Sequence, residues 1–304
     1  MAGSPFIPSF MGAVDSATPT GFSAAIFGAP HGTPYPGIDN RVHETAPDTF
    51  RKSLAEDSLW LDHWDFDLGG TLLSHGLSVC DLGNLPTAPQ DGEGNRTLIE
   101  TKTRGILEAG AVPIMFGGDD SVPIPFIAAY SDQPATVILQ IDAHIDWRHE
   151  RHGETMGFSS TMRRASEHSH VWRIVQAGAR GIGSAREAEV KDAIAWGARL
   201  ITSRDIHRDG VGQVLDHIPE GCDCVISFDC NALDVSQMPA VVYPTPGGLS
   251  YTQVTDLIAG VAARARIAGF CMVEFVPGRD TAGTAAFTAA RIAANVVGRI
   301  ARPE

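Results

Sequence analysis

The sequence predicts an α/β protein with three layers (α/β/α), in which a parallel central sheet of about eight strands lies between two layers of helices. Two observations lead to this fold class. Short apolar runs rich in β-branched residues alternate along the chain with longer segments of helical periodicity. Several of the short runs are apolar at every position, as in parallel strands that helices cover on both faces. Right-handed strand-helix-strand crossovers then place such strands in one parallel sheet.

The chain has 304 residues, of which 43% are hydrophobic, so it can bury a large core. Strand and helix patterns alternate from residue 23 to residue 304, which favours one domain rather than two. Residues 1–22 are rich in Ser, Pro, Gly and Ala and are expected to form an N-terminal arm.

A formal net charge of −13 argues against nucleic acid or a membrane surface as a partner, and it would suit a cationic ligand. Ordinary solubility is the simpler explanation of the same acidity. Five cysteines, an odd number spread over a long chain, favour a reducing compartment. No apolar run is long enough to span a membrane, and the chain does not begin with a secretion signal, so we expect a cytoplasmic protein.

Apolar β-branched runs predict four strands in the first half of the chain, at residues 24–28, 77–83, 112–116 and 138–141. Helices are expected to begin near Pro47 and to span residues 97–109, where apolar side chains recur at helical spacing. The segment that follows the first strand, up to Gly37, is dense in Pro and Gly and is therefore expected to form a loop.

In the second half the expected strands are residues 173–178, 198–201, 224–228 and 269–275. The expected helices begin near Met162 and span residues 185–196, 251–264 and 284–298. The polar segment 147–155 and the Pro- and Gly-rich segment 235–249 are expected to be loops, the first of them over the strand ends.

Metal-capable side chains follow the strand at residues 138–141. Asp142, His144 and Asp146 are spaced two residues apart. In an extended backbone, side chains two residues apart point the same way. Carboxylates and imidazoles are common metal ligands, so this spacing indicates a metal or ligand site at the end of a buried strand.

Two other strand ends carry similar groups. Asp229 and Asn231 follow the strand at 224–228, and the glycine turn Gly117–Ser121 follows the strand at 112–116. In an open α/β sheet, ligands bind where the carboxyl ends of strands converge. We therefore predict that the three segments form one acid-lined pocket. The alternative, that these polar side chains are only structural, requires three such strand ends to coincide by chance.

The three motifs resemble the signatures of the ureohydrolase family, the arginases and agmatinases, which are Gly-Gly-Asp-His-Ser, Asp-Ala-His-x-Asp and Ser-x-Asp-x-Asp-x-x-Asp-Pro. The chain has Gly117–Ser121, Asp142–Asp146 and Ser227–Val235 in the same order. The resemblance implies an arginase-like fold and a binuclear manganese site, or nickel as in some relatives, that hydrolyses a guanidino group to urea and an amine. It places the metal ligands at Asp120, Asp142, His144, Asp146, Asp229 and Asn231.

The resemblance also implies three catalytic residues. Asp146 would hold the hydroxide that bridges the metals, Glu274 would pair with the planar guanidinium, and His152 would pass a proton to the leaving amine. Glu274 ends an apolar strand, where a buried acid is costly unless it has a function. His149 lies close to His152 in the sequence, and the sequence leaves open which of the two takes part.

Two of the six ligand positions depart from the family pattern, one at each metal. Asp120 stands where the motif has His, and Asn231 stands where it has Asp. Val235 also replaces the final Pro. Asp120 can still offer an oxygen to a hard cation, and four aspartates remain to balance two divalent ions. Asn231 is a neutral and weaker donor, so we expect lowered affinity at both metal positions.

Two functional hypotheses follow from these departures. In the first, the chain is a non-catalytic subunit that assembles with copies of itself and with a catalytically competent paralogous subunit, as a trimer or hexamer. It then resembles the degenerate subunit of hetero-oligomeric hydrolases such as metformin hydrolase, which act on small cationic guanidino or biguanide compounds, and it need not bind metal itself. In the second, the chain is an active, agmatinase-like amidinohydrolase that uses Mn or Ni with Asp120 and Asn231 as atypical ligands.

Four converging carboxylates repel one another when no cation is present. A metal-free site therefore needs bound protons, water or a basic side chain nearby. The sequence suggests Arg148, Arg151 or Arg279 for this purpose.

Overall fold

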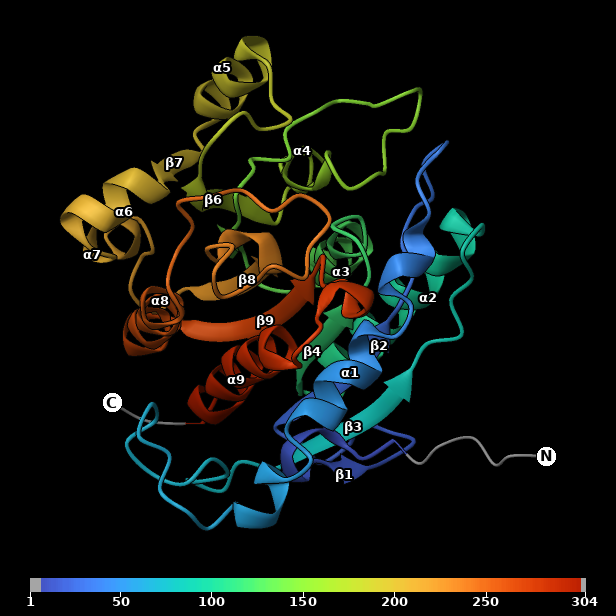
Figure 1. Cartoon of the computed structure of the whole chain (residues 1–304), viewed down its shortest axis with the longest axis vertical. Helices are drawn as coiled ribbons and strands as arrows, with labels where there is room; N and C mark the ends of the chain where they lie inside the picture. Colours follow the sequence, from blue (N-terminus) through green and yellow to red (C-terminus); the bar gives the residue numbers. More distant parts are fainter. Residues whose placement is uncertain (1–6, 302–304) are drawn as a thin grey trace.

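The computed structural model describes residues 7–301 and has the three-layer arrangement that the sequence predicts (Figure 1). Within these residues nine strands form one sheet, all parallel, in the order β1-β3-β2-β4-β9-β8-β5-β6-β7. The strands are β1 (Val14–Asp15), β2 (Ala24–Ala29), β3 (Val79–Asn84), β4 (Val112–Gly117), β5 (Thr136–Ile141), β6 (Val171–Ala179), β7 (Arg199–Thr202), β8 (Asp223–Asp229) and β9 (Arg266–Val273). Eight of them match predicted strands, and the two-residue β1 was not predicted.

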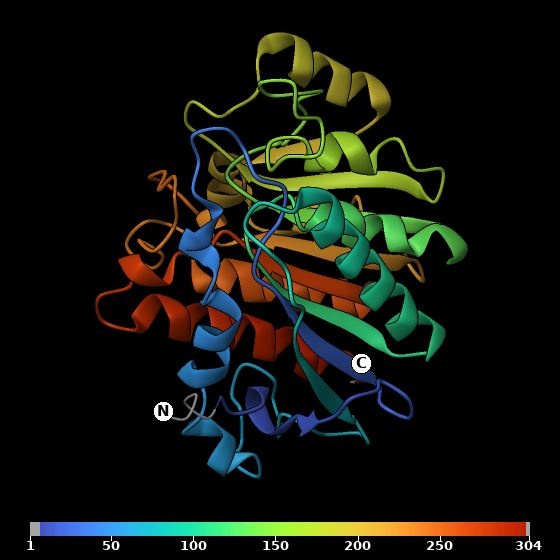
Figure 2. The same ribbon diagram turned by 90° about the vertical axis from the view of Figure 1, so that its right-hand side faces the viewer.

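Helices cover both faces of the sheet (Figure 2). The α-helices are α1 (Ala46–Ser53), α2 (Gly92–Glu108), α3 (Pro123–Ala128), α4 (Thr161–Ala165), α5 (Glu187–Trp196), α6 (Ser203–Asp209), α7 (Gly212–Leu215), α8 (Tyr251–Arg264) and α9 (Thr284–Arg299). Short 3-10 turns lie at Phe10–Gly12, Asn40–His43, Asp57–Trp60, Ala129–Asp132, Cys230–Ala232 and Pro277–Arg279.

Two hydrophobic cores lie on opposite faces of the sheet, because successive side chains of a strand point in opposite directions. In β5, Ile138 packs into the core under α2 to α5, and Leu139 packs into the core under α1 and α6 to α9. In β4, Met115 packs into the same core as Ile138, and Phe116 packs into the same core as Leu139. The central strands are therefore apolar at every position, which is the pattern seen in the sequence.

Helices α8 and α9 show how local sequence sets these layers. Helix α8 begins at a capping box in which Ser250 and Gln253 satisfy each other's backbone N–H groups. In α9, Ala285, Ala289 and Ala293 are fully buried and lie four residues apart, on one face of the helix. These small side chains let α9 pack closely between the sheet and its neighbours α1 and α8.

Residues 7–22, the part of the expected N-terminal arm that the structure describes, lie against the edge of the sheet. The Phe10 ring is buried and packs edge-on against Phe116 at a centroid distance of 5.0 Å. The backbone N–H of Phe10 donates to Asp81 at 3.1 Å, and the Arg51 guanidinium holds the same carboxylate at 2.8 Å. Residues 1–6 of the arm lie outside the described residues.

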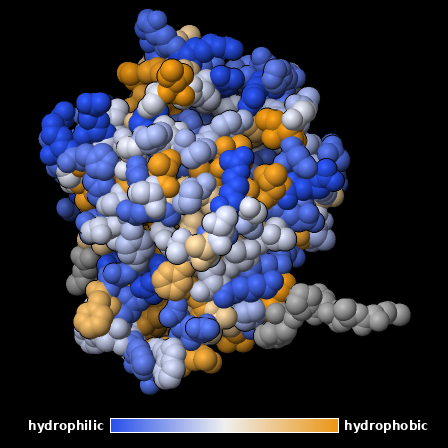
Figure 3. Space-filling view, viewed as in Figure 1, coloured by the Kyte–Doolittle hydropathy of each residue, from blue (hydrophilic) through white to orange (hydrophobic). Residues whose placement is uncertain are grey.

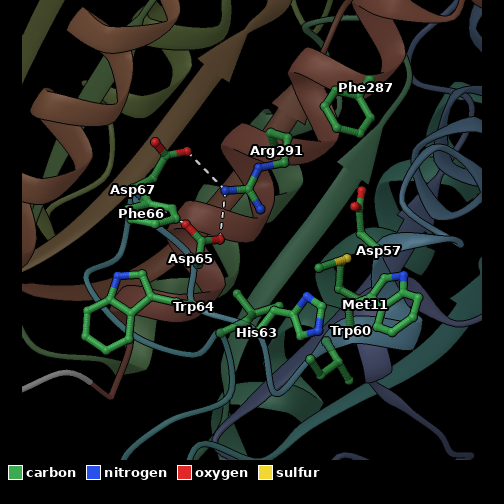
Figure 4. Close-up of a pocket in the computed structure, with 12 residues that line it drawn as sticks. Met11, Asp57, Trp60, His63, Trp64, Asp65, Phe66, Asp67, Phe287 and Arg291 are labelled. Atoms are coloured by element: carbon green, nitrogen blue, oxygen red, sulfur yellow. Dashed lines mark hydrogen bonds and ion pairs between the residues drawn. The ribbon is translucent and has the colours of Figure 1, made fainter.

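A long excursion, residues 54–78, connects α1 to β3 and packs against α9. Arg291 of α9 binds Asp65 at 2.7 Å and Asp67 at 3.0 Å (Figure 4). Beside these ion pairs lies a pocket of about 380 Å³, which Trp60 and Trp64 help to line. The excursion exposes four large apolar side chains, which are Leu59, Trp60, Trp64 and Phe66.

None of the helices in residues 7–301 is long and apolar enough to cross a membrane. On the face shown in Figure 3, hydrophobic side chains form small separate patches on a mostly hydrophilic surface. That face therefore presents no continuous apolar band.

Candidate functional site

The predicted site residues come together at one edge of the sheet. Strands β4, β9, β8 and β5 are consecutive neighbours, and their carboxyl ends meet there. A pocket of about 980 Å³ opens at this edge. Seven of the eight predicted site residues line it: Asp120, His144, Asp146, His152, Asp229, Asn231 and Glu274. The eighth, Asp142, is buried beside His144 and Asp229.

Possible metal ligands form two groups in the described chain. Asp142, His144 and Asp229 make up one, and Asp120, Asp142 and Asp146 make up the other. Within each group the ligand atoms lie within 4.8 Å of one another. Asp142 belongs to both groups, as a carboxylate that bridges two ions would. The donor set therefore fits a pair of hard divalent cations, although each group alone offers only three ligands.

Asp120 fits a ligand position despite replacing the histidine of the family motif. Asp119 binds the backbone N–H and hydroxyl of Ser121 and so stabilises the turn, which leaves Asp120 directed into the site. Asp120 is 3% exposed, and neither of its carboxylate oxygens has a hydrogen-bond partner among the described residues. Burial and the charges of neighbouring acids, Asp146 first, raise its pKa well above the usual range. A bound cation would relieve this unpaired buried group.

Asn231 is held by hydrogen bonds through both atoms of its side-chain amide. Its Oδ1 accepts a hydrogen bond from the backbone N–H of Ala143 at 2.9 Å, which fixes the orientation of the amide. Its Nδ2 donates to Asp229 at 2.7 Å and lies 3.3 Å from Nδ1 of His144. Asn231 therefore directs an N–H donor at Asp229 and His144, and its predicted role as a metal ligand remains a prediction. An N–H group cannot bind a cation.

The acids of the site are stabilised by groups that the sequence analysis missed. Nε2 of Gln140 donates to Asp142 at 2.9 Å and to Asp146 at 2.7 Å. Gln176, opposite Gln140 in the neighbouring strand β6, donates to Oε1 of Gln140 and so orients it. The sequence signal was one glutamine in each of two neighbouring, largely buried strands, β5 and β6. Their position next to the motif acids indicates a supporting layer below the site.

The basic residues proposed for charge balance have other partners. Nε of Arg148 donates to the carbonyl of Ser184 at 2.7 Å, and Arg279 binds the carbonyl of Val241 at 2.5 Å. Arg151 stacks on aromatic rings instead. Arg180 is attracted by the charges of the buried Asp142 and Asp229, and its guanidinium binds backbone carbonyl groups of the loop after β8.

Protons also stabilise the acids when no cation is bound. Burial, and the charge of Asp142 after it, raise the pKa of Asp146 and of Asp229 well above the usual range. For His144, burial lowers the pKa, but the hydrogen bond and charge of Asp142 outweigh it and raise the pKa to about 9. The site is therefore suited to hold positive charge, as protons or as metal ions.

The three predicted catalytic residues share an unusual backbone conformation. Asp146, His152 and Glu274 have φ values of 43°, 54° and 66°, and only two other non-glycine residues within 7–301 have positive φ. Such conformations cost free energy and cluster at functional sites. Glu274 accepts a hydrogen bond from the backbone N–H of Asp120 at 2.9 Å. Of the two candidate histidines, His152 lines the pocket, whereas His149 is exposed and lies 3.2 Å from Arg164.

A glycine is required where the 117–121 turn meets the first loop of the chain. A Cβ atom on Gly118 would lie 2.4 Å from the carbonyl oxygen of Pro30, so only glycine allows this contact. The close approach positions the turn that carries Asp120.

Comparisons with known proteins agree with this geometry. The sequence pattern of the arginase family matches residues 22–298. The chain is 34% identical over 209 residues to an N(1)-aminopropylagmatine ureohydrolase of Thermus thermophilus, covering 68% of each chain. It is 26% identical to the mitochondrial guanidino acid hydrolase of Homo sapiens, covering 90% of this chain and 77% of that protein.

Among solved structures, the fold is similar to that of proclavaminate amidino hydrolase from Streptomyces clavuligerus. The TM-score is 0.84 at 25% identity, with 98% of this chain and 99% of that chain covered. The agmatine ureohydrolase of Thermoplasma volcanium gives a TM-score of 0.79 at 24% identity, covering 97% and 95% of the two chains. The arginase-like fold is thereby confirmed, and the chain belongs to the arginase family.

Proposed function

We propose that this chain is a ureohydrolase-family subunit with a degenerate binuclear metal site, which serves as the non-catalytic partner in a hydrolytic complex. The complex would cleave a C–N bond of a guanidino or biguanide compound and release urea or a guanyl product together with an amine. One observation carries this proposal: the amide N–H group of Asn231 faces Asp229 and His144, where a second metal ion would bind.

The chemistry of the family explains why this one contact matters. Two bound Mn or Ni ions would supply a hydroxide nucleophile near neutral pH, which a single weakly held ion would do less well. Asp120, Asp142 and Asp146 would hold one ion, and Asp142, His144 and Asp229 would hold the other. In the second group Asn231 already donates to Asp229, so an ion there would have to displace that hydrogen bond.

The surface of the molecule supports a role in an assembly. The 54–78 excursion exposes Trp64 at 61% and Phe66 at 91%, and Phe287 of α9 is exposed beside the same pocket. Clusters of exposed aromatic side chains are typical of protein interfaces. We propose that this surface contacts other subunits, either copies of this chain or a catalytically competent paralogue such as those of metformin hydrolase-like complexes.

A second candidate function is an active metal-dependent amidinohydrolase. The unpaired carboxylate of Asp120 favours it, because this group is buried without a partner and directed at the first metal position. In that case Glu274 would bind the planar guanidinium through both carboxylate oxygens, Asp146 would orient the nucleophile, and His152 would transfer a proton to the leaving amine. Asp120 and Asn231 would then be the atypical ligands of a Mn or Ni site.

The cysteines bear on the compartment in which the protein works. All five cysteines are free in the structure, which is compatible with a reducing compartment. A cytoplasmic location remains a prediction.

One experiment separates the two functions. The purified chain is incubated with Mn²⁺ or Ni²⁺ and with agmatine, guanidinobutyrate or a dimethylated biguanide, and urea or guanyl products are measured alongside metal content per chain. We expect no turnover by the chain alone, metal well below two ions per chain, and turnover only when a paralogous subunit is added. Release of urea by the isolated chain would establish the active hydrolase instead.

A further inference from the structure

We infer that the pocket beside the 54–78 excursion binds an arginine side chain of a neighbouring subunit. The inference rests on the proposed function in one respect, which is that this surface contacts other subunits, and it names the group that the surface recognises. The pocket, of about 380 Å³, is called the aromatic pocket below, after Trp60, Trp64 and Phe287 in its lining. It shares no lining residue with the acid-lined pocket at the carboxyl ends of the strands.

Aromatic rings form the walls of the aromatic pocket. Trp60, His63, Trp64 and Phe66 come from the excursion, and Phe287 comes from α9 (Figure 4). The ring centroids of Trp60 and His63 lie 4.9 Å apart, so these two rings support each other. Trp60, Trp64 and Phe287 are exposed, which leaves ring surface available to a partner. Guanidinium groups bind to the faces of aromatic rings, and tryptophan binds them most strongly.

The carboxylate of Asp57 brings negative charge to the aromatic pocket. Within residues 7–301 this carboxylate has no hydrogen-bond or ion-pair partner (Figure 4). Residues 54–78 contain five acidic residues and neither lysine nor arginine. Arg291 binds two of the acids, Asp65 at 2.7 Å and Asp67 at 3.0 Å, so the excursion stays negative with this cation counted. A complementary partner surface must therefore carry positive charge.

The aromatic pocket is held in shape before a partner binds. The carboxylate of Asp67 accepts hydrogen bonds from Arg291 at 3.0 Å and from the hydroxyl of Tyr251 at 2.5 Å, which ties the excursion to α9 and α8. Leu68 and Leu72, which follow the aromatic residues in the chain, are buried in the core. A site that needs little ordering loses less conformational entropy when it binds. The pocket is therefore suited to hold one side chain in a fixed position.

An arginine side chain suits this arrangement better than a lysine side chain. Asp57 and Trp60 are the first and last residues of a four-residue 3-10 turn, in which side chains three residues apart lie on the same side. A planar guanidinium can stack on the Trp60 ring while its in-plane N–H groups donate to Asp57. A lysine ammonium has no flat face and is more strongly hydrated. Arginine and tryptophan are also among the residues that contribute most to binding at protein interfaces.

Light scattering coupled to size-exclusion chromatography tests the inference on the full chain, over a range of concentrations and with and without a paralogous subunit. Asp57→Asn keeps the shape of the side chain but removes its charge, and we expect it to raise the dissociation constant of the assembly about tenfold. Asp62→Asn is the matched control, because it makes the same charge change in the excursion but outside the aromatic pocket. It should change the dissociation constant by less than about twofold.

Two changes at Trp60 separate the recognition of a cation from ordinary apolar packing. Trp60→Leu keeps an apolar side chain but removes the ring, whereas Trp60→Phe keeps a ring. We expect Trp60→Leu to raise the dissociation constant about fivefold and Trp60→Phe to raise it only about twofold. Equal effects of the two variants would contradict the use of the ring face by a cation.

Small competitors identify the side chain that the aromatic pocket binds. Nα-acetyl-arginine amide should dissociate the assembly at about tenfold lower concentration than Nα-acetyl-citrulline amide, which has nearly the same shape but no charge. Nα-acetyl-lysine amide carries the same charge as the arginine compound and should act between the two. In Asp57→Asn the difference between the arginine and citrulline compounds should fall to within about twofold.

An assembly whose dissociation constant is unchanged in Asp57→Asn would overturn the inference and leave the proposed partner role intact. A lysine compound that acts as strongly as the arginine compound would also overturn it. A chain that stays monomeric with and without the paralogue would overturn both the inference and the partner role. If the isolated chain releases urea, the partner role fails, while weaker self-assembly of Asp57→Asn than of Asp62→Asn would still uphold the inference.

Discussion

At the scale of single residues, we expect the difference between an amide and a carboxylate at position 231 to decide how well a second metal ion would be held. Nδ2 of Asn231 donates to Asp229 and faces His144, so a donor occupies the side where the family motif has an oxygen. Asp120 replaces a neutral imidazole by an anionic ligand, which a divalent cation accepts. We therefore expect the amide at position 231 to weaken metal binding more than the aspartate at position 120 does.

The variant Asn231→Asp should restore an oxygen ligand at the second metal position. We expect it to raise Mn²⁺ content per chain and to tighten Mn²⁺ binding by about tenfold, because an added carboxylate ligand replaces a repulsive N–H group. Elemental analysis and calorimetric titration measure both quantities. The control is Asn84→Asp, which makes the same charge change beside Arg51, at the far end of the sheet order.

Unchanged metal binding in Asn231→Asp would mean that Asp120 also limits the site. The double variant Asp120→His with Asn231→Asp distinguishes this case, since it restores both motif ligands. If the double variant also binds no additional metal, the degenerate site cannot be attributed to these two positions.

At the scale of secondary-structure elements, the loop after β8 is held by one carboxylate. Asp234 accepts hydrogen bonds from the backbone N–H groups of Ser236 at 3.0 Å, Gly247 at 2.9 Å and Gly248 at 3.1 Å. The hydroxyl and backbone N–H of Ser236 lead the contacts that lower the pKa of Asp234 to about 2. These contacts, which we call the Asp234 clamp, close residues 234–248 into a loop. Thr245 of this loop lines the pocket.

The clamp predicts a pH-dependent contribution to stability. Since the folded pKa of Asp234 lies below the unfolded value of about 3.9, its contribution is fully present above pH ~4 and is lost as pH falls towards 2. Asp234→Asn should lower the free energy of unfolding by about 1 kcal/mol at pH 7, after allowance for the partial exposure of Asp234, and by much less at pH 2.5. Urea denaturation at both pH values measures this, with the exposed Asp216→Asn as control. An equal loss of unfolding free energy at both pH values would contradict this role of Asp234.

The sequence predicted the strands better than the short helices. Strands such as β5 and β8 are buried on both faces and are therefore apolar throughout, which leaves little ambiguity. Helix α3 was missed because Pro123 and Pro125 suggest an irregular segment, although both lie in its first turn, where proline is tolerated. β1, α6 and α7 have too few residues to show a clear period.

The site, too, could be predicted from the sequence only in part. The convergence of Asp120, Asp142 and Asp229 followed from their places after parallel strands, which the topology brings to one edge. The orientation of Asn231 could not be predicted, because it depends on the backbone N–H of Ala143, a contact that only the folded chain creates. The stacking of Arg151 on Tyr35 and Phe158 could not be predicted either, because the two rings come from separate loops.

At the scale of the whole molecule, the 54–78 excursion forms an apolar exposed projection. Leu59 is 74% exposed, and Trp60, Trp64 and Phe66 are also exposed, while Arg291 anchors the segment to α9 (Figure 4). The excursion also carries Glu56, Asp57 and Asp62, so a complementary surface would be apolar at its centre and basic at its edge.

The proposed assembly predicts that this excursion is needed for subunit contact. The double variant Trp64→Ser with Phe66→Ser should shift the chain from a trimer or hexamer towards the monomer, because exposed aromatic side chains contribute most to binding at interfaces. Light scattering coupled to size-exclusion chromatography, with and without a paralogous subunit, measures the mass. Trp172→Ser, which removes an exposed tryptophan from β6, is the matched control and should leave the mass unchanged. If the double variant keeps the mass of the unmodified chain, the subunits make contact elsewhere. If the unmodified chain is a monomer and does not bind the paralogue, the proposed partner role is wrong.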